Sequence, residues 1–276
     1  MKKFLCAAMA ALLACGILAG CGGGSDEGTA QNRLEQIKAA GKIVVATSPD
    51  FPPSEFIDAS KTGQDQYQGY EMTVARYIAE QLGVELEIKA MDFKTVLTSV
   101  GQGTVDLAIS GLAPTEDRKE TMDFTQPVRI SEDGHCIVVR KEDADKYTSL
   151  EDFNGVTVGA QISSLQAKLL TEQTQANMEN VNKINEGVLS LKTKRIDGLA
   201  MSEPNAKIYC SKYPDDYAIA AKFDYDSDGA CIAVPKGETE LLNAIDEIIT
   251  EYKQDPALSQ GWYDEAVEYA ASLLEE

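Results

Sequence analysis

The fold is decided by residues 85–109, which read ELEIKAMDFKTVLTSVGQGTVDLAI. Apolar and charged residues alternate over 85–88, which is typical of a strand with one buried face. Apolar residues then recur at helical spacing, at Phe93, Val96, Leu97 and Val100. Gly101 and Gly103 end this helix, and residues 106–109, Asp-Leu-Ala-Ile, predict a second strand.

The same succession begins earlier in the chain. The β-branched run 43–46 predicts a buried strand. A helix follows and ends at Gly83; its apolar face consists of Met72, Ala75, Ile78, Ala79 and Leu82. Residues 43–109 therefore give strand, helix, strand, helix, strand, which predicts a parallel sheet covered by helices.

A second α/β pattern follows after Asp133. Its predicted strands lie at 135–139, 156–160 and 198–201, and its helix lies at 164–172. A further strand at 231–234 leads into a helix at 240–253 with one apolar face. The chain of 276 residues is thus long enough for two α/β lobes of roughly 100 residues each.

The first 21 residues, MKKFLCAAMAALLACGILAGC, have the layout of an export signal. Two lysines precede an apolar run at 4–18 that is short for a permanent membrane span. The ending Leu-Ala-Gly-Cys resembles the lipobox of bacterial lipoproteins, which implies cleavage after residue 20 and acylation of Cys21. An ordinary secretory signal or a short anchor helix is the alternative.

The run at 22–28 supports the lipoprotein interpretation, because a polar, glycine-rich segment behaves as a flexible tether. A lipid on Cys21 would hold the protein on a membrane surface without spanning it. We therefore expect an extracytoplasmic protein that is lipid-anchored to the cell membrane.

The charge balance excludes one class of partner. The chain has 45 acidic and 25 basic residues, with a formal net charge of −20 at pH 7. Nucleic-acid binding requires a basic face, so no nucleic-acid partner is expected.

Signatures of catalysis and metal binding are mostly missing from the sequence. It contains no nucleophile elbow, phosphate-binding loop or dinucleotide fingerprint, and its single histidine is His135. Outside the leader, Cys136, Cys210 and Cys231 have spacings that fit no zinc site. Their odd number permits at most one disulfide among them. We expect no metal and no cofactor.

Candidate binding residues follow the predicted strands, where open α/β sheets bind small molecules. After the first strand, two prolines fix a turn that can hold Phe51 forward. After the third strand, Ser110 offers a hydroxyl and Gly111 exposes its backbone. Arg118 carries a guanidinium fork that matches a carboxylate. Phe93 begins a helix and is either a core residue or a ligand-facing one.

A family resemblance rests on the loop Ser-Gly-Leu-x-x-Thr-Glu-x-Arg at 110–118 and on Met-Asp-Phe-Thr at 122–125. With the segments 69–72 and 155–161, it resembles the family 3 extracellular solute-binding proteins, receptors of polar amino-acid ABC importers. The resemblance runs from about residue 34 to the C-terminus. It implies a non-enzymatic monomer that captures a small carboxylate-bearing solute, an amino acid first of all, and delivers it to a membrane permease.

The resemblance also implies a two-lobed periplasmic-binding-protein-like α/β fold of type II, in which each lobe has a mostly parallel sheet with flanking helices. Two hinge strands near 128–132 and 226–230 would let the lobes close on a solute. The implied organisation is a signal peptide at 1–20, a lipidated tether at 21–33, a first lobe at 34–128 plus 231–276, and a second lobe at 133–226.

The resemblance implies a role for each matching position of this chain. Arg118 matches the arginine that grips the ligand α-carboxylate, and Ser110 and Gly111 match contacts to the ammonium and carboxylate groups. Phe51 and Phe93 match aromatics that enclose the ligand side chain. The further ligand-binding positions are Ser48, Ala113, Gln161, Ser164, Leu165, Ser202 and Glu203.

One departure from the family bears on the ligand. Ser202 stands where relatives usually place the aspartate or glutamate that pairs the ligand ammonium, and a desolvated ammonium without an anion is costly. Glu203 takes that role, or Glu71 or Asp50 compensates, or the ligand is not an ordinary α-amino acid.

Two rival functions remain at this point. A dehydratase-like enzyme on the same fold would need an acid/base pair, for which Glu203 and Asp50 are the best candidates. The ligand-sensing domain of a signalling receptor is the other rival, and the leader ending at Cys21 disfavours it.

Overall fold

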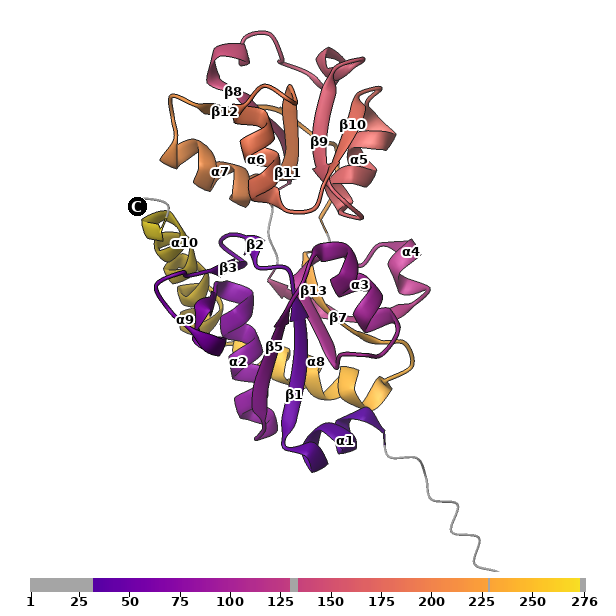
Figure 1. Ribbon diagram of the computed structural model, residues 1–276. Coiled ribbons are helices and arrows are strands. Elements are labelled where there is room, and N and C mark those ends of the chain that lie inside the picture. Colours follow the sequence, from indigo (N-terminus) through magenta and orange to yellow (C-terminus); the bar gives the residue numbers. More distant parts are fainter. Residues whose placement is uncertain (1–31, 130–133, 228, 274–276) are drawn as a thin grey trace, which may run out of the picture. The chain divides into compact units, whose positions relative to one another are not determined.

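The computed structural model describes residues 32–129, 134–227 and 229–273. They form two large β-sheets with helices packed on them, and one small sheet (Figure 1). We call each large sheet with its helices a lobe. The predicted signal peptide, Cys21 and almost all of the tether lie outside the described residues, as do parts of both predicted hinges.

The first lobe contains a five-stranded sheet with the strand order β5-β1-β6-β13-β7. Its strands are β1 (Lys42–Thr47), β5 (Glu85–Ala90), β6 (Leu107–Leu112), β7 (Met122–Arg129) and β13 (Ala230–Pro235). β1 pairs in parallel with β5 and with β6, as the strand-helix-strand pattern predicts. β13 pairs antiparallel with β6 and β7, so a segment from much later in the chain returns to this sheet.

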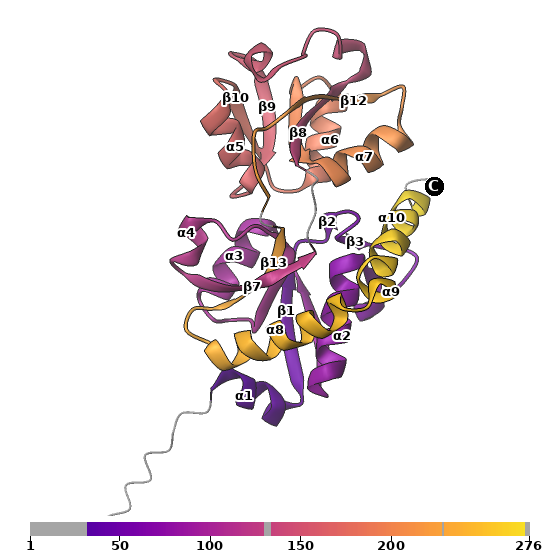
Figure 2. The same ribbon diagram turned by 180° about the vertical axis from the view of Figure 1, so that it is seen from behind.

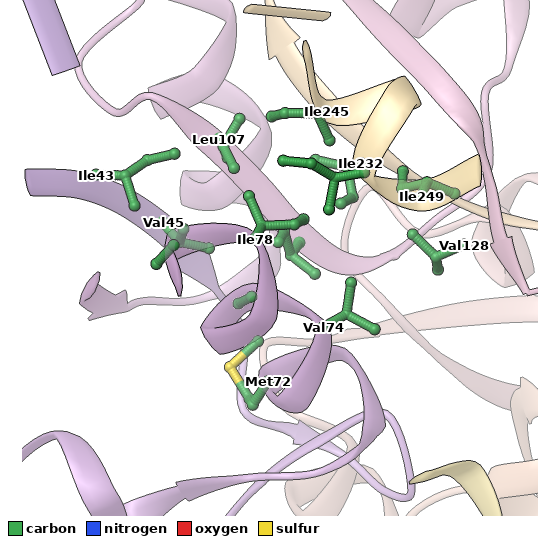
Figure 3. Close-up of a cluster of buried hydrophobic side chains, with 14 of the residues drawn as sticks. Ile43, Val45, Met72, Val74, Ile78, Leu107, Val128, Ile232, Ile245 and Ile249 are labelled. Carbon is green, nitrogen blue, oxygen red and sulfur yellow. The ribbon is translucent and has the colours of Figure 1, made fainter. Parts of the chain in front are cut away.

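Alternation along β1 explains why helices cover both faces of the first sheet. Ile43 and Val45 join the core on one face, whereas Ala46 joins the core on the other. The first face is covered by α1 (Arg33–Ala40), α2 (Tyr70–Leu82) and α8 (Thr239–Lys253). Figure 3 shows Ile78 of α2 and Ile245 of α8 packed with these strand residues. α3 (Phe93–Gly101) covers the second face.

The second lobe repeats the same pattern of strand directions in the order β10-β9-β11-β8-β12. Its strands are β8 (His135–Arg140), β9 (Thr157–Gln161), β10 (Asn177–Val181), β11 (Gly198–Ser202) and β12 (Tyr217–Lys222). β9 pairs in parallel with β10 and β11, and β8 pairs antiparallel with β11 and β12. α5 (Leu165–Gln173) covers one face, and α6 (Ile184–Lys192) and α7 (Glu203–Lys212) cover the other.

Shorter elements complete the described chain. The small sheet contains β2 (Asp50–Phe51), β3 (Glu55–Ile57) and β4 (Tyr67–Gln68). The remaining helices are η1 (Gly63–Gln66), α4 (Glu116–Lys119), η2 (Lys141–Asp143), η3 (Leu150–Phe153), α9 (Pro256–Ser259) and α10 (Gly261–Leu273). Ala270 of α10 packs with Phe56 of β3 and Ile208 of α7, so this C-terminal helix contacts both lobes (Figure 2).

The two-lobed α/β fold class is confirmed. Half of the strand pairings in each large sheet are antiparallel, so the sheets are mixed rather than mostly parallel. The third predicted strand is longer than expected, since β6 continues through Ser110 and Gly111 to Leu112. At the predicted hinges, Arg129 of β7 pairs with Ala230 of β13. Among the described helices, none combines the length and apolar character needed to cross a bilayer.

Candidate ligand-binding site

A cavity lies between the two lobes and is lined by side chains from both. Eleven of the twelve residues predicted to bind ligand line it: Ser48, Phe51, Phe93, Ser110, Gly111, Ala113, Arg118, Gln161, Ser164, Leu165 and Ser202. Glu203, the twelfth, lies outside the lining.

Arg118 brings a buried positive charge to this cavity. Its Nη1 donates to the carbonyl of Ala113 at 2.8 Å, and its Nη2 donates to the carbonyl of Ser163 in the second lobe at 3.0 Å. The guanidinium lies 5.4 Å from the centre of the Phe93 ring, within the range of a cation–π contact. Burial lowers the pKa of Arg118 to about 10, so the side chain stays charged at neutral pH. The arrangement suits a carboxylate held by a planar fork.

The end of β6 forms the wall of the cavity beside Arg118. Ser110 Oγ accepts a hydrogen bond from the Ser48 N–H at 3.0 Å and donates to Glu55 Oε1 at 3.1 Å. Gly111 has a φ of +59°, and a Cβ there would lie 3.4 Å from the Phe51 ring. Glycine at this position therefore permits both the left-handed backbone and the close approach of Phe51.

Two buried carboxyl groups, Glu55 of β3 and Glu71 of α2, also line the cavity. Glu71 Oε2 accepts a 2.7 Å hydrogen bond from the Gly111 N–H. Desolvation raises the pKa of Glu71 to about 7, although the Gly111 N–H and Glu55 both act to lower it. Desolvation, and then the charge of Glu71, raise the pKa of Glu55 well above its usual value. The sequence prediction named Glu71 as a possible compensating acid and missed Glu55.

The second lobe contributes two helix N-termini to the cavity. Ser164 caps α5, with its Oγ accepting from the Ala167 N–H at 3.0 Å. Ser202 caps α7, with its Oγ accepting from the Asn205 N–H at 3.4 Å. Both capping serines line the cavity, so these helix ends favour negative charge there.

The residue before the α5 cap has an unusual backbone. Ser163 has a φ of 64°, in the left-handed region that glycine adopts most readily. This conformation directs the carbonyl of Ser163 to Arg118.

Hydrogen bonds join the lobes at the other side of the cavity. Asp50 Oδ2 accepts from the Ile184 N–H at 2.6 Å and from Gln161 Nε2 at 3.4 Å. Asn205, which is fully buried, donates from Nδ2 to the carbonyl of Pro52 at 3.0 Å. The lobes are thus held together by direct contacts around the cavity.

Glu203 lies away from the cavity and interacts with lysines instead. Its Oε1 is 2.9 Å from Lys222 Nζ and 3.2 Å from Lys207 Nζ. Burial acts to raise the pKa of Glu203, but the hydrogen bonds from the two lysines bring it below its usual value. Ser202 and Glu203 are neighbours in sequence, yet the first lines the cavity as a helix cap and the second, although buried, does not line it.

Several further residues that line the cavity were missed by the sequence prediction. They include Tyr70, Arg129, His135, Gln166 and Tyr263. His135 Nδ1 lies 3.0 Å from Gln166 Nε2, and burial lowers the pKa of His135 to about 4. His135 is therefore neutral at pH 7. Its place at the start of β8, directly after the predicted hinge, was a signal that could have indicated the site.

The described residues contain no cluster of histidine, cysteine and acidic side chains able to hold a metal ion. No disulfide joins Cys136, Cys210 and Cys231 to one another. Cys136 and Cys231 are buried, where a cysteine packs as a small apolar side chain.

Comparisons with known proteins agree with this geometry. Residues 43–265 match the family model described as bacterial extracellular solute-binding proteins, family 3. Over 264 residues, the chain is 28% identical to the arginine-binding extracellular protein ArtP of Bacillus subtilis (strain 168), covering 94% of this chain and 96% of that protein.

Solved structures are similar as well. One is an amino acid ABC transporter substrate-binding protein from Streptococcus pneumoniae Canada MDR_19A bound to L-arginine, with a TM-score of 0.78 and 34% identity over 88% of this chain and 98% of the other. Another is the ancestral amino acid-binding protein AncCDT-1, a precursor of cyclohexadienyl dehydratase. The match covers 86% of this chain and 98% of that chain, with a TM-score of 0.73 and 27% identity. The resemblance stated from sequence is confirmed, and because the family model covers most of the chain, this protein belongs to the bacterial extracellular solute-binding proteins, family 3.

Proposed function

We propose that this protein binds an amino acid in the cavity between its lobes and delivers it to the permease of an ABC importer. The observation that carries the proposal is Arg118, a buried guanidinium that lines the cavity and contacts both lobes. A ligand carboxylate at this fork would be held by charge-assisted hydrogen bonds.

The opposite charges of the cavity support an amino acid rather than a simple carboxylic acid. Arg118 and the helix N-termini at Ser164 and Ser202 favour an anion, whereas Glu55 and Glu71 favour a cation. A zwitterion carries both groups. L-Arginine is the first candidate, because similar proteins of known structure bind it.

Closure of the lobes is part of the proposed mechanism. The hinges proposed near 128–132 and 226–230 would let the lobes separate, and a ligand that contacts both lobes would stabilise the closed form. The bond of Asp50 to Ile184 and that of Arg118 to Ser163 are contacts that such an opening would break.

We also propose that the mature protein is a monomer tethered to the membrane by a lipid on Cys21. The lipobox-like sequence before Cys21 and the glycine-rich run at 22–28 support this anchor. Incorporation of labelled palmitate into the wild type, and its loss in Cys21→Ala, would test the anchor directly.

A thermal-shift screen of purified protein, lacking residues 1–21, against the standard amino acids, short peptides and small carboxylates tests the proposed function. A ligand that binds only the folded protein raises the melting temperature by mass action. We expect L-arginine or another amino acid to raise it by several degrees and to bind saturably in calorimetry. A screen in which carboxylates without an amino group bind and no amino acid does would overturn the amino-acid assignment.

The same samples separate binding from catalysis. Glu203, which the dehydratase hypothesis would use, pairs with Lys207 and Lys222 outside the cavity, and this favours a binding role. We propose that the ligand is released chemically unchanged. Mass spectrometry of ligand recovered after prolonged incubation should return the starting compound, and accumulation of a dehydrated product would contradict the proposal.

A further inference from the structure

Glu55 and Glu71 form an acid pair at the cavity. They come from β3 and α2, and their exposed fractions are 1% and 2%. Within residues 32–129, 134–227 and 229–273, no other carboxyl group lines the cavity. Since Ser202 has no charge and Glu203 faces Lys207 and Lys222, this pair is the source of negative charge that the cavity offers to a cation.

Hydrogen bonds within the described chain satisfy Glu55 Oε1 and Glu71 Oε2, but not Glu55 Oε2. Gly111 donates to Glu71 Oε2 at 2.7 Å, and Ser110 donates to Glu55 Oε1 at 3.1 Å. Glu55 Oε2 is buried and receives no hydrogen bond from any donor in the described chain. Two adjacent buried carboxylates cannot both ionise at low cost, and a proton on Glu55 Oε2 that is donated to Glu71 satisfies both groups.

Neighbouring groups do not supply this charge or mask its titration near neutral pH. Arg118 on α4 and Arg129 on β7 bring positive charge to the lining. His135 on β8 has its pKa lowered to about 4 by burial, and Asp50 on β2 contributes a nearby negative charge that raises the pKa of Glu55.

The surrounding phenols also keep their protons in this range. Burial raises the pKa of Tyr252 on α8 to about 12 and raises that of Tyr70 on α2 further. Tyr263 on α10 is a third phenol at the cavity. Within the acid pair, the pKa of Glu71 is raised to about 7 and that of Glu55 is raised well above its usual value, so the pair binds protons near neutral pH.

We propose that a cationic nitrogen group of the ligand, an ammonium or a guanidinium, binds at Glu55 and Glu71 and displaces the proton that the pair shares in the empty protein. The inference rests on the proposed function, because it requires an amino-acid ligand in this cavity. The displaced proton passes to the buffer, and the cation takes its place between the carboxylates. Binding is therefore coupled to proton release and tightens as the pH rises.

Calorimetry at each pH, in two buffers that both hold that pH and differ in ionisation enthalpy, such as phosphate and MES at pH 6, measures this exchange. With L-arginine as the probe, we expect net proton release at pH 6 that diminishes as the pH rises. The dissociation constant should fall by up to about tenfold per pH unit between pH 5 and pH 7. Saturable binding with no proton release at pH 6 overturns the inference and leaves the proposed function intact.

L-Citrulline identifies which cation displaces the proton, because it keeps the ammonium and replaces the guanidinium by a neutral group of similar shape. Proton release with both compounds assigns the pair to the ammonium. Proton release with L-arginine alone assigns it to the guanidinium. Failure of every amino acid to bind would instead overturn the proposed function, and the inference with it.

Glu55→Gln tests whether the pair is the source of the proton. The amide can donate to Glu71 permanently, so proton release and the pH dependence of binding should both disappear. Asp58→Asn is the matched control, since Asp58 is a buried carboxylate beside β3 that does not line the cavity, and it should release protons like the wild type. If Glu55→Gln does not fold, Glu71→Gln and the wild-type calorimetry still decide. Undiminished proton release in a folded Glu55→Gln variant would refute the assignment.

Discussion

Asp50 in the first lobe caps a helix of the second lobe. Its Oδ2 accepts a 2.6 Å hydrogen bond from the N–H of Ile184, the first residue of α6. The N-cap residue of α6, Lys183, makes no capping hydrogen bond through its side chain. A helix N-terminus is thus stabilised from across the cavity, and this contact exists only while the lobes are together.

Asp50→Ala should weaken ligand binding by opening the lobes. A lost helix cap costs about 1–2 kcal/mol, which corresponds to about 5- to 30-fold in the dissociation constant if the bond forms only on closure. Stopped-flow measurement should show the loss mainly as faster dissociation. Asp255→Ala removes a similar cap from α9 within the first lobe and should leave the affinity unchanged. Equal affinity losses in both variants would contradict the capping role.

Ser163→Gly should stabilise the protein. Ser163 has a φ of 64°, which costs about 1 kcal/mol for a residue with a Cβ and little for glycine. After the extra chain entropy of glycine, we expect a net gain of about 0.5 kcal/mol, or a rise of 1–2 °C in melting temperature. Lys194→Gly, with a φ of 61° outside the cavity, should give a similar gain. A lower melting temperature for Ser163→Gly alone would show that the serine side chain has a role of its own.

Local patterns predicted much of the fold because they depend on near neighbours in the chain. The β-branched run 43–46 predicted a buried strand, and β1 is buried on both faces; Gly83 ends α2 as expected, and its backbone is left-handed. The direction of β13 was not predictable in this way. It inserts between β6 and β7 after the chain has built the whole second lobe.

The same distinction applies to the candidate site: residues close in sequence could be identified from a motif, and residues that meet only in the fold could not. Arg118, Ser110 and Gly111 follow one another closely, so a short motif identifies them. Glu55 and Glu71 meet only because β3 packs beside α2, and a chain with 45 acidic residues gives no sign of which two are buried together. The bond between Asp50 and Ile184 joins residues of different lobes and has no sequence signal.

Glu203→Gln should leave ligand binding nearly unchanged. Glu203 lies outside the cavity lining and pairs with Lys207 and Lys222, whose side chains are half or more exposed. Such pairs contribute at most about 1 kcal/mol, so the melting temperature should fall by a few degrees at most. Calorimetry should give a dissociation constant within about twofold of the wild type. A tenfold loss of affinity would indicate that Glu203 takes part in ligand binding.

Asp58→Asn should reduce stability at neutral pH but not in acid. Hydrogen bonds from Ser60, and then from Tyr269 of α10, lower the pKa of Asp58 to about 2. The folded value lies below the ordinary value of 3.8, so this stabilisation is complete above about pH 4 and is lost as the pH falls towards 2. The difference in melting temperature between wild type and variant should therefore shrink over that interval.

The exposed Asp65 of the same segment provides the control for this pH series, because Asp65→Asn should differ little from the wild type at any pH. A constant difference between wild type and Asp58→Asn from pH 6 to pH 3 would contradict the account of how α10 is held.

Isothermal titration calorimetry of wild type and Arg118→Ala, with the amino acid selected by the screen, tests the central claim most directly. Arg118 lines the cavity and is proposed to hold the ligand carboxylate, so its loss should cost about 2–4 kcal/mol, or roughly 30- to 1000-fold in affinity. Arg195→Ala, which removes an exposed arginine paired with Glu179, is the control and should bind like the wild type. A folded Arg118→Ala protein with an unchanged dissociation constant would contradict the binding site described for this chain.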